Sequence, residues 1–437
     1  MRKFAAVAAV AVSVFAVPVT FAAESAEVDA GDISAPAMGT EATVVPPRDF
    51  LDVAVPGWTT VAGNPKNPKN LVATASGACL AYRSSNGGRT WSRPVALPIG
   101  IGYLNECYQA SVAYAPDGKS VYAAYEVDPL AASAYETNIL VTRSEDNGAT
   151  WRRPVVAAAT LDGIDVEYYS LVLTTPVRAT DADGVYLIAF YVSGDGIGPC
   201  ESIVFARSVD RGANWSPPKT VTGACPGDEG DIIGDATVAG GVDGDVLVAW
   251  THYASLDQRV LGTVKVRRSQ NHGATFGPTI VAATDVALYP DWYAQLDAKV
   301  GNQGTAHIVY QRQAPSQGDQ GDIGYIWGAP PYRTWAAPVT ISDDTVGSTQ
   351  SAPLLATQTC GSTTLLQVAW GDARKLYPDT DVFYTRKLAQ PGSAWSTNLQ
   401  VSDSSGGSPA GLATSPGGAF ATWYGYGSRI LSGVTCP

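Results

Sequence analysis

The chain has 437 residues, of which 45 are glycine, 29 are proline and only 16% are charged, with a net charge of −12 at pH 7. An acidic surface repels phosphate groups, which argues against a nucleic-acid partner. Short runs rich in Val, Ala, Tyr and Thr alternate with Gly, Asp and Pro clusters, and long amphipathic helical patterns are missing. This alternation predicts an all-β fold.

The N-terminus has the pattern of an export signal. Met1-Arg2-Lys3 is followed by an apolar run from Phe4 to Val19 and then by small residues suited to cleavage. We expect residues 1–22 to be a signal peptide, because a run of about 16 apolar residues is short for a membrane span; a membrane anchor is the alternative. Residues 23–42 lack periodicity and are expected to form a flexible arm. The mature protein is predicted to be secreted, extracellular or periplasmic, without stable membrane insertion.

From residue 43 to 437 the dominant feature is an internal repeat. An octapeptide with Ser at position 1, Asp or Asn at position 3, Gly at position 5 and an aromatic residue at position 8 occurs four times. Two degenerate copies keep the aromatic residue and its surroundings. The four full copies are Ser84–Trp91, Ser144–Trp151, Ser208–Trp215 and Ser269–Phe276, and the degenerate copies end at Trp335 and Trp395. The aromatics recur about every 60 residues, so each copy belongs to one structural unit.

The chemistry of the octapeptide is that of a turn. Asp or Asn at position 3 can accept hydrogen bonds from N–H groups of the turn, and Gly at position 5 permits positive φ. We expect the aromatic to fold back against the hairpin. The acidic residue is therefore interpreted as structural rather than catalytic.

Each repeat holds four short strands, with the octapeptide between the third and the fourth. Small sheets of this size bury their faces by packing radially, which predicts a single β-propeller domain of four-stranded blades over residues 43–437. Six aromatic positions mark six repeats, and residues 406–434 supply about three further strands. Glu41–Val45 can add the fourth strand and close the ring. We expect seven blades, with six as the alternative.

These Ser-x-Asp-x-Gly-x-Thr-Trp turns, one per blade, resemble the Asp-box repeats of the bacterial neuraminidase repeat proteins, a family typified by sialidases. The resemblance spans nearly all of the mature chain. It implies a propeller that hydrolyses glycosides with a Tyr nucleophile activated by a Glu, an Asp as general acid and base, and three arginines that bind the substrate carboxylate. Family sialidases have six blades and begin with a Phe/Tyr-Arg-Ile-Pro segment. This chain contains no Arg-Ile-Pro, so the first arginine has no counterpart.

The loops that enter the innermost strands converge on the channel of a propeller, on the face away from the repeated turns. In four of these loops a carboxylate stands two residues before a large residue. The predicted catalytic set is drawn from them: Glu106, Tyr108, Glu167, Tyr169, Asp231, Asp291 and Tyr293, with Asp235 close by in sequence. A catalytic group is usually unique, whereas a structural cap recurs in every blade, and so capping carboxylates with aromatics packed between blades remain the alternative.

Arginines in successive blades are the predicted substrate clamp, since a guanidinium binds a carboxylate through two parallel hydrogen bonds. The predicted substrate-binding residues are Arg259, Arg312, Arg374 and Arg429, together with Trp292. Ion pairs with neighbouring acids such as Asp372 or Asp379 are the alternative for these arginines.

Six cysteines in an exported chain indicate disulfides. Their places in the repeat predict the pairs Cys79–Cys107, Cys200–Cys225 and Cys360–Cys436. No metal site is predicted, because the three histidines have no ligand spacing. No cofactor is expected, although the acidic run Asp228–Asp231 with Asp235 offers oxygen ligands for Ca²⁺ and has a solvated loop as its alternative.

Three functions follow as hypotheses. The first is a secreted, sialidase-like glycoside hydrolase of the exo-sialidase type that acts on a glycan or polysaccharide at the mouth of the channel. The second is a propeller that binds glycans or a cell surface without catalysis. The third is a scaffold for protein interactions.

Overall fold

The computed structural model describes residues 43–45 and, with gaps, residues 59–432. The gaps are residues 76, 78, 105, 131–136, 160–164, 195–198, 223–231, 255–260, 288–293, 314–320, 344–347, 375–379, 403–406, 416–417 and 424–426. The predicted signal peptide and arm, residues 1–42, lie outside the described residues. Among the described residues no helix is long and apolar enough to cross a membrane.

The described chain folds into β-strands and one short 3₁₀ helix, η1 (Ala179–Asp181). The first sheet contains β2 (Thr59–Gly63), β3 (Leu71–Ala75), β4 (Leu80–Ser84) and β5 (Val95–Ala96). The second contains β6 (Ala110–Tyr114), β7 (Val121–Val127), β8 (Asn138–Ser144) and β9 (Val155–Ala159). The third contains β10 (Asp165–Thr174), β11 (Val185–Gly194), β12 (Pro199–Ser208) and β13 (Lys219–Thr220).

The same unit of four antiparallel strands continues along the chain. It recurs as β14 (Ile232–Gly240), β15 (Val246–Tyr253), β16 (Gly262–Ser269) and β17 (Ile280–Val286). It recurs again as β18 (Leu296–Val300), β19 (Ala306–Arg312), β20 (Asp322–Gly328) and β21 (Val339–Thr340), then as β22 (Gln350–Cys360), β23 (Thr363–Asp372), β24 (Asp381–Leu388) and β25 (Leu399–Gln400). A single residue pair, Val286 with Arg312, joins the fourth and fifth units into one sheet of eight strands.

The last sheet is built from both ends of the chain. Its strands run in the order β1 (Thr43–Val45), β28 (Gly427–Ser432), β27 (Gly418–Trp423) and β26 (Pro409–Ser415). The N-terminal strand pairs antiparallel with β28, with Thr43 opposite Ser432. This is the pairing that the sequence predicted for Glu41–Val45, and it supplies the fourth strand of the unit.

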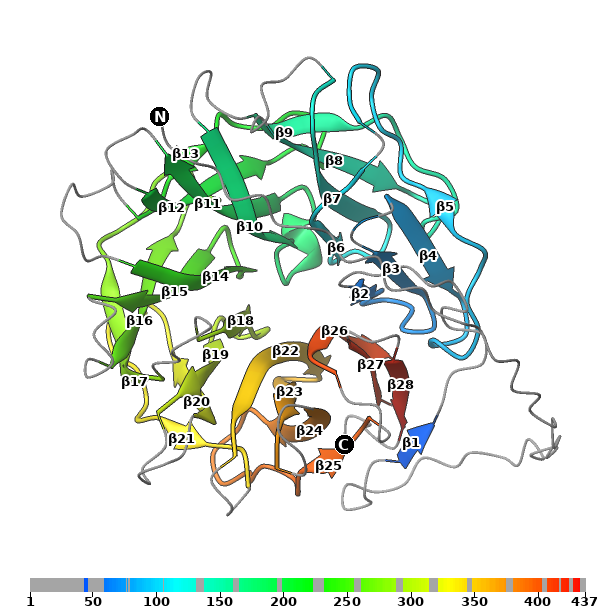
Figure 1. The fold of residues 1–437 in the computed structure, drawn as a ribbon. Coiled ribbons are helices and arrows are strands. Elements are labelled where there is room, and N and C mark those ends of the chain that lie inside the picture. Colours follow the sequence, from blue (N-terminus) through cyan, green and yellow to red (C-terminus); the bar gives the residue numbers. More distant parts are fainter. Residues whose placement is uncertain are drawn as a thin grey trace, which may run out of the picture. The chain divides into compact units, whose positions relative to one another are not determined.

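The first strand of each unit lies innermost, and these strands follow one another around a closed ring (Figure 1). The order of contact is β2, β6, β10, β14, β18, β22, β26 and back to β2. The described strands thus form a β-propeller of seven four-stranded units, which we call blades 1 to 7 in this order. Radial packing is the physical solution for sheets that cannot bury both faces alone.

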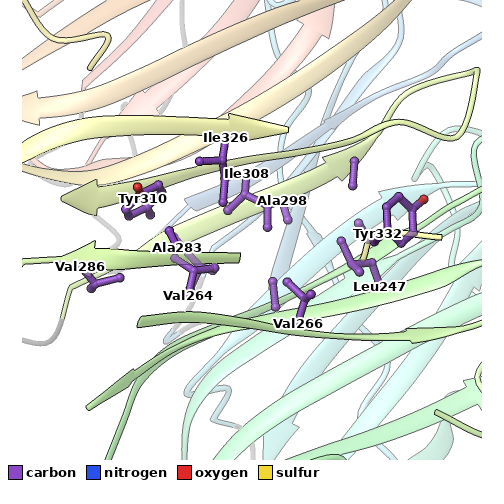
Figure 2. Packing of buried hydrophobic residues seen from close by; sticks show 14 of the residues in the cluster. Leu247, Val264, Val266, Ala283, Val286, Ala298, Ile308, Tyr310, Ile326 and Tyr332 are labelled. Carbon is purple, nitrogen blue, oxygen red and sulfur yellow. The ribbon is translucent and has the colours of Figure 1, made fainter. Parts of the chain in front are cut away.

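The core consists of layers of small and branched side chains between adjacent blades. Figure 2 shows the layer between blades 4 and 5, where Val264 and Val266 of β16 face Ile308 of β19 and Ala298 of β18. These side chains are at most 1% exposed. The alternation of buried and less buried residues along β16 and β18 follows from the two-residue period of a strand.

The octapeptide turns form the hydrogen bonds that their sequence predicts. In the second copy, Ser144 Oγ accepts the N–H of Gly148 at 2.8 Å, and Asp146 Oδ1 accepts the N–H of Thr150 at 2.8 Å. Gly148 has φ +79° and Asn147 has φ +56°, so position 4 as well as position 5 is left-handed. Burial works to raise the pKa of Asp146, but the hydrogen bonds from Thr150, Ser144 and Ala149 prevail and lower it. This carboxylate therefore stabilises the turn.

The turn aromatics make the predicted contact with their own hairpin and a second contact with the neighbouring blade. Trp91 does bond back to its own turn, with Nε1 donating to the carbonyl of Gly88 at 3.0 Å. Its ring also lies 5.2 Å, centroid to centroid, from Phe420 of β27, in the preceding blade of the ring. Phe276 stands in the same relation to Phe205 of blade 3, at 5.0 Å. The turns therefore join neighbouring blades, because each aromatic is shared between two sheets.

Candidate functional site

The innermost strands of all seven blades line a central channel with a cavity of about 590 Å³. Its wall is made mostly of small, apolar and hydroxyl side chains. The charged residues of the wall are Asp235 of β14, Asp297 of β18 and Lys299 of β18. The channel is thus the place where groups from different blades converge.

Asp235 is half-buried in this wall, where it joins three blades. Its Oδ2 atom accepts the N–H of Leu296 from blade 5 at 3.1 Å, and its Oδ1 atom accepts the hydroxyl of Ser170 from blade 3 at 3.3 Å. Burial raises its pKa to about 6, against the opposing effect of the hydrogen bonds from Leu296, Ala236 and Ser170, while the charge of Asp297 raises it further. A carboxyl with a pKa near neutrality can exchange a proton at physiological pH.

Asp297 repeats this arrangement one blade further on. Its Oδ2 atom accepts the N–H of Leu355 from blade 6 at 2.9 Å, and its Oδ1 atom accepts the hydroxyl of Thr237 from blade 4 at 3.3 Å. Lys299 forms an ion pair with the same carboxylate at 2.6 Å. Since the oxygens of both aspartates are committed to the neighbouring strands, these residues hold the wall of the channel together.

Directly before Gln109, which lines the channel, two predicted catalytic residues lie together with Asp128, a residue that the sequence analysis missed. The hydroxyl of Tyr108 lies 2.8 Å from Asp128 Oδ2 and 3.2 Å from Glu106 Oε2, so its one proton has two carboxylate acceptors within reach. Tyr108 directly precedes Gln109, which lines the channel. We call Glu106, Tyr108 and Asp128 the mouth cluster. It combines an aromatic ring that is 47% exposed with two carboxylates, a composition suited to a ligand rich in hydroxyl groups.

The electrostatics of the mouth cluster keep the phenol protonated. The hydrogen bond to Asp128 is the largest cause that raises the pKa of Tyr108 far above its usual value, followed by burial and by the negative charges of Asp128 and Glu106. The Oδ1 atom of Asp128 is shielded from solvent and has no hydrogen-bond partner among the described residues.

The disulfide between Cys79 and Cys107 supports the mouth cluster from blade 1. It joins two buried cysteines whose Cα atoms are 5.2 Å apart, as the sequence predicted. Cys107 directly precedes Tyr108, so the covalent link fixes the backbone that carries the tyrosine. Of the other predicted pairs, Cys200 lies on β12 and Cys360, at the end of β22, is disulfide-bonded. Cys225 and Cys436 lie outside the described residues, and these two pairings remain predictions.

The catalytic roles of the whole predicted set, Glu106 and Tyr108 included, stay predictions. Glu167 and Tyr169 lie on β10, where the backbone of Glu167 is opposite Val192. Asp231, Asp291, Trp292 and Tyr293 lie outside the described residues, as does the acidic run 228–231 considered for Ca²⁺. Of the four loops with a carboxylate before a large residue, the one with Glu106 and Tyr108 is the one in which the structure describes the side chains of both members.

Two of the four predicted clamp arginines form ion pairs with aspartates. The guanidinium of Arg312, on β19, lies 2.7 Å from Asp285 and donates to Thr340 Oγ1 at 2.8 Å. Arg374 pairs with Asp372 at 2.7 Å and with Asp343 at 2.8 Å. These are the contacts of the ion-pair alternative, which named Asp372. Arg429 lies on β28 and Arg259 lies outside the described residues, so the clamp itself stays a prediction.

Asp128 could have been found from the sequence by its position. It follows the apolar run Val121–Val127 directly, where the second strand of a blade reaches the channel face and the loop begins. The predicted catalytic carboxylates all come from loops that enter the first strands, whereas Asp128 begins a loop that follows a second strand. Since neighbouring strands run antiparallel, the end of the second strand lies beside the start of the first, at the same face.

Comparisons with known proteins give likenesses of fold. The sequence matches no protein-family model and no curated protein. Among solved structures, the chain is similar to a Hadza microbial sialidase, with 16% identity, a TM-score of 0.45 and coverage of 85% of this chain and 73% of that one. It is similar to the NanB sialidase from Streptococcus pneumoniae, with 10% identity, a TM-score of 0.47 and coverage of 84% and 82%.

A third solved structure is similar over nearly its full length. It is the hydrazine synthase of Kuenenia stuttgartiensis, with 10% identity, a TM-score of 0.52 and coverage of 88% of this chain and 99% of that one. At such identities these likenesses concern the propeller fold and carry no information about activity.

Proposed function

We propose that this protein is a secreted propeller that binds a glycan at the mouth of its central channel and cleaves it as a glycoside hydrolase of the sialidase type. The observation that carries the proposal is the contact of the Tyr108 hydroxyl with the carboxylates of Glu106 and Asp128. A nucleophile within hydrogen-bond distance of its base is the signature of covalent catalysis, and tyrosine is the nucleophile of the sialidase variant of glycoside hydrolysis.

In the proposed reaction, Tyr108 Oη attacks the anomeric carbon while Glu106 takes its proton. The bond from that carbon to the leaving oxygen breaks, and an acid protonates this oxygen; Asp231 and Asp291 are the candidates from the sequence. Water then hydrolyses the glycosyl-tyrosine: the aspartate that protonated the leaving oxygen takes a proton from the water, and Glu106 returns its proton to the phenol oxygen as the bond to the anomeric carbon breaks. The raised pKa keeps the phenol of Tyr108 neutral before the reaction and makes the transfer of its proton to the base a demanding part of the step.

Two features support export of the protein. The predicted signal peptide over residues 1–22 directs the chain out of the cytoplasm. The Cys79–Cys107 disulfide beside the mouth cluster is typical of proteins in oxidising compartments. Both agree with a glycan or polysaccharide outside the cell as the ligand.

Glycan binding without hydrolysis is a second candidate, favoured by the arginines. Arg312 and Arg374 already balance the charges of aspartates. A carboxylate-bearing sugar would have to compete with these aspartates for the guanidinium groups. The mouth cluster alone offers a ring for stacking and carboxylates for sugar hydroxyls, which suffices to bind a neutral glycan.

The test separates chemistry from binding at one residue. Turnover of a panel of fluorogenic glycosides, sialoside included, and binding to a glycan array are measured for the mature protein and for Tyr108→Phe, Tyr108→Ala and Glu106→Gln. We expect Tyr108→Phe to lose turnover about 10³-fold while binding persists, because the ring remains and the nucleophile is gone. Tyr108→Ala should lose both.

Tyr103→Phe is the matched control, since Tyr103 forms a β-bridge with Pro129, next to Asp128, and among the described residues its hydroxyl accepts a long hydrogen bond, 3.4 Å, from Asn138. Its turnover and binding should equal those of the wild type. Binding without any turnover in the wild type would assign the second candidate. Neither binding nor turnover would contradict both.

A further inference from the structure

A second cavity lies between blades 4 and 5, beside the fourth octapeptide turn. Its volume is about 400 Å³, within the range of sites for small ligands. Its wall combines residues 268–280, which carry the fourth turn, with Pro331 and Arg333 of the degenerate fifth turn. These turns follow the third strand of a blade, whereas the mouth cluster lies where a first strand begins and a second ends. Since neighbouring strands run antiparallel, the cavity is on the opposite face of the propeller.

The fifth turn keeps the shape of the octapeptide without its sequence. Tyr332 takes position 5, where the full copies have Gly, and has φ +62°. Trp335 Nε1 donates to the carbonyl of Tyr332 at 3.1 Å, which is the bond that the first copy forms between Trp91 and Gly88. A left-handed conformation strains a bulky residue, and strained positions of this kind concentrate at ligand sites.

The ring of Tyr332 holds an arginine in the wall of the cavity. Tyr332 is buried, and the guanidinium of Arg268 lies 5.0 Å from the centre of its ring. Asp245 forms an ion pair of 2.5 Å with the same guanidinium, so Arg268 is fixed by two partners. Arg333 follows Tyr332 in the turn, is exposed and forms no ion pair among the described residues. The cavity therefore has one fixed and one unpaired guanidinium in its wall.

Positive charge gathers around this cavity, although the chain has a net charge of −12 and none of the described residues in the wall is acidic. Behind the wall, Arg207 donates to the carbonyl of Asn271 at 3.0 Å. Lys219 donates to the carbonyl of Ala274 in the same turn at 2.6 Å. Burial and the charge of Arg207 lower the pKa of Lys219, as expected where cations outnumber acids. A negatively charged ligand is consequently attracted to this cavity.

The neutral part of the wall suits a sugar ring. Phe276 and Pro331 provide apolar surfaces, and the exposed amide of Gln270 can both donate and accept hydrogen bonds. Guanidinium groups bind carboxylates through paired hydrogen bonds. A sugar ring that carries a carboxylate uses all of these groups, whereas an acidic peptide would use the charges and leave the apolar surfaces uncovered.

We propose that this cavity is a second binding site, which holds a uronate residue of an acidic polysaccharide. The carboxylate of the sugar pairs with Arg333 and Arg268, and its ring lies against Phe276 and Pro331. The site goes beyond the proposed function, because it lies on the opposite face from the mouth cluster and shares no residue with it. A polysaccharide held there leaves the mouth cluster open to its own ligand.

The experiment measures binding of trigalacturonate to the mature protein by isothermal titration calorimetry. Galactotriose is the neutral probe and triglutamate is the acidic peptide probe. We expect trigalacturonate to bind about tenfold more tightly than either. Arg333→Ala should weaken its binding about tenfold or more, and Arg333→Lys should restore only part of the loss, because lysine keeps the charge without the paired hydrogen bonds.

Arg89→Ala is the matched control, since Arg89 stands at position 6 of the first turn, as Arg333 does in the fifth, and is likewise exposed. This variant and Tyr108→Ala should bind trigalacturonate as the wild type does. The inference is overturned if trigalacturonate does not bind, if either other probe binds as tightly, or if Arg333→Ala leaves binding unchanged. Binding that is lost in Tyr108→Ala and kept in Arg333→Ala would assign trigalacturonate to the mouth cluster instead. Failure of the proposed function, by contrast, leaves the dependence on Arg333 intact.

Discussion

The Oδ2 atom of Asp235, on the innermost strand of one blade, accepts a hydrogen bond from the backbone N–H of Leu296 on the next blade at 3.1 Å. Asp297 forms the equivalent bond with Leu355 one blade further on. Backbone donors at the ends of irregular strands need partners when they are buried, and here a side chain from the neighbouring sheet provides them. The channel wall is therefore a continuous hydrogen-bonded surface across blades 4 to 6.

Replacing Asp235 tests how burial controls this contact. Its pKa is about 6 in the folded protein and 3.8 without burial, so the folded state retains a proton that the unfolded state has released between these pH values. Raising the pH from 4 to 7 should therefore lower the free energy of unfolding of the wild type, relative to Asp235→Asn, by up to about 3 kcal/mol. Urea unfolding of both proteins across this range measures the difference, and parallel pH profiles would show that the carboxylate titrates as an ordinary aspartate.

Gly88 tests the contact between a repeated turn and the preceding blade. It has φ +88°, and a Cβ atom added there would lie 2.5 Å from Cδ2 of Phe420. We expect Gly88→Ala to lower the free energy of unfolding by about 2–4 kcal/mol, from backbone strain together with overpacking. Gly392→Ala is the matched control, because Gly392 has φ +79° but no atom within 4 Å of an added Cβ, and it should cost about 1 kcal/mol. Equal losses in urea unfolding would refute the contact between the blades.

Arg374 separates the ion-pair interpretation from the predicted substrate clamp. Its guanidinium pairs with Asp372, whose side chain is fully buried, and lies 4.1 Å above the ring of Phe383. Arg374→Ala leaves a buried carboxylate unpaired and should lower the free energy of unfolding by about 3 kcal/mol. The double variant Arg374→Ala/Asp372→Asn should recover part of this loss, whereas glycan affinity per folded molecule should stay unchanged. A variant of normal stability with weakened binding of sialosides would instead place Arg374 in the clamp.

Much of the propeller could be predicted because its signals are local. The octapeptide turns follow from residues within eight positions of one another, and their regular spacing reveals the blade. The exchange of strand β1 into the last sheet was also predictable, since residues 406–434 supply only three strands and a sheet needs partners for its edge. The Cys79–Cys107 pair followed from placing both residues at strand ends on one face.

The candidate site was predictable only in part. The sequence placed Glu106 and Tyr108 at the mouth of the channel but did not find Asp128, because the contact joins residues 20 positions apart across two loops. It proposed Arg374 both as a clamp and as an ion-pair partner, and only the position of Asp343, from another blade, shows how this guanidinium is satisfied. Likewise, the sequence does not predict that Ile101 is exposed, because an isoleucine is ordinarily buried.

The sequence by itself determined the class of fold, the repeated turn and the path of the strands, because turn chemistry and strand alternation act between residues close in the chain. Only the tertiary structure decided which carboxylates hold the channel wall, which arginines are paired and which apolar side chains face solvent. Those properties depend on what the neighbouring blade places within a few ångströms, about 60 residues away in the chain. Hydrogen bonds and ion pairs act over a few ångströms in space, so a pattern read along the chain cannot rank the possible partners.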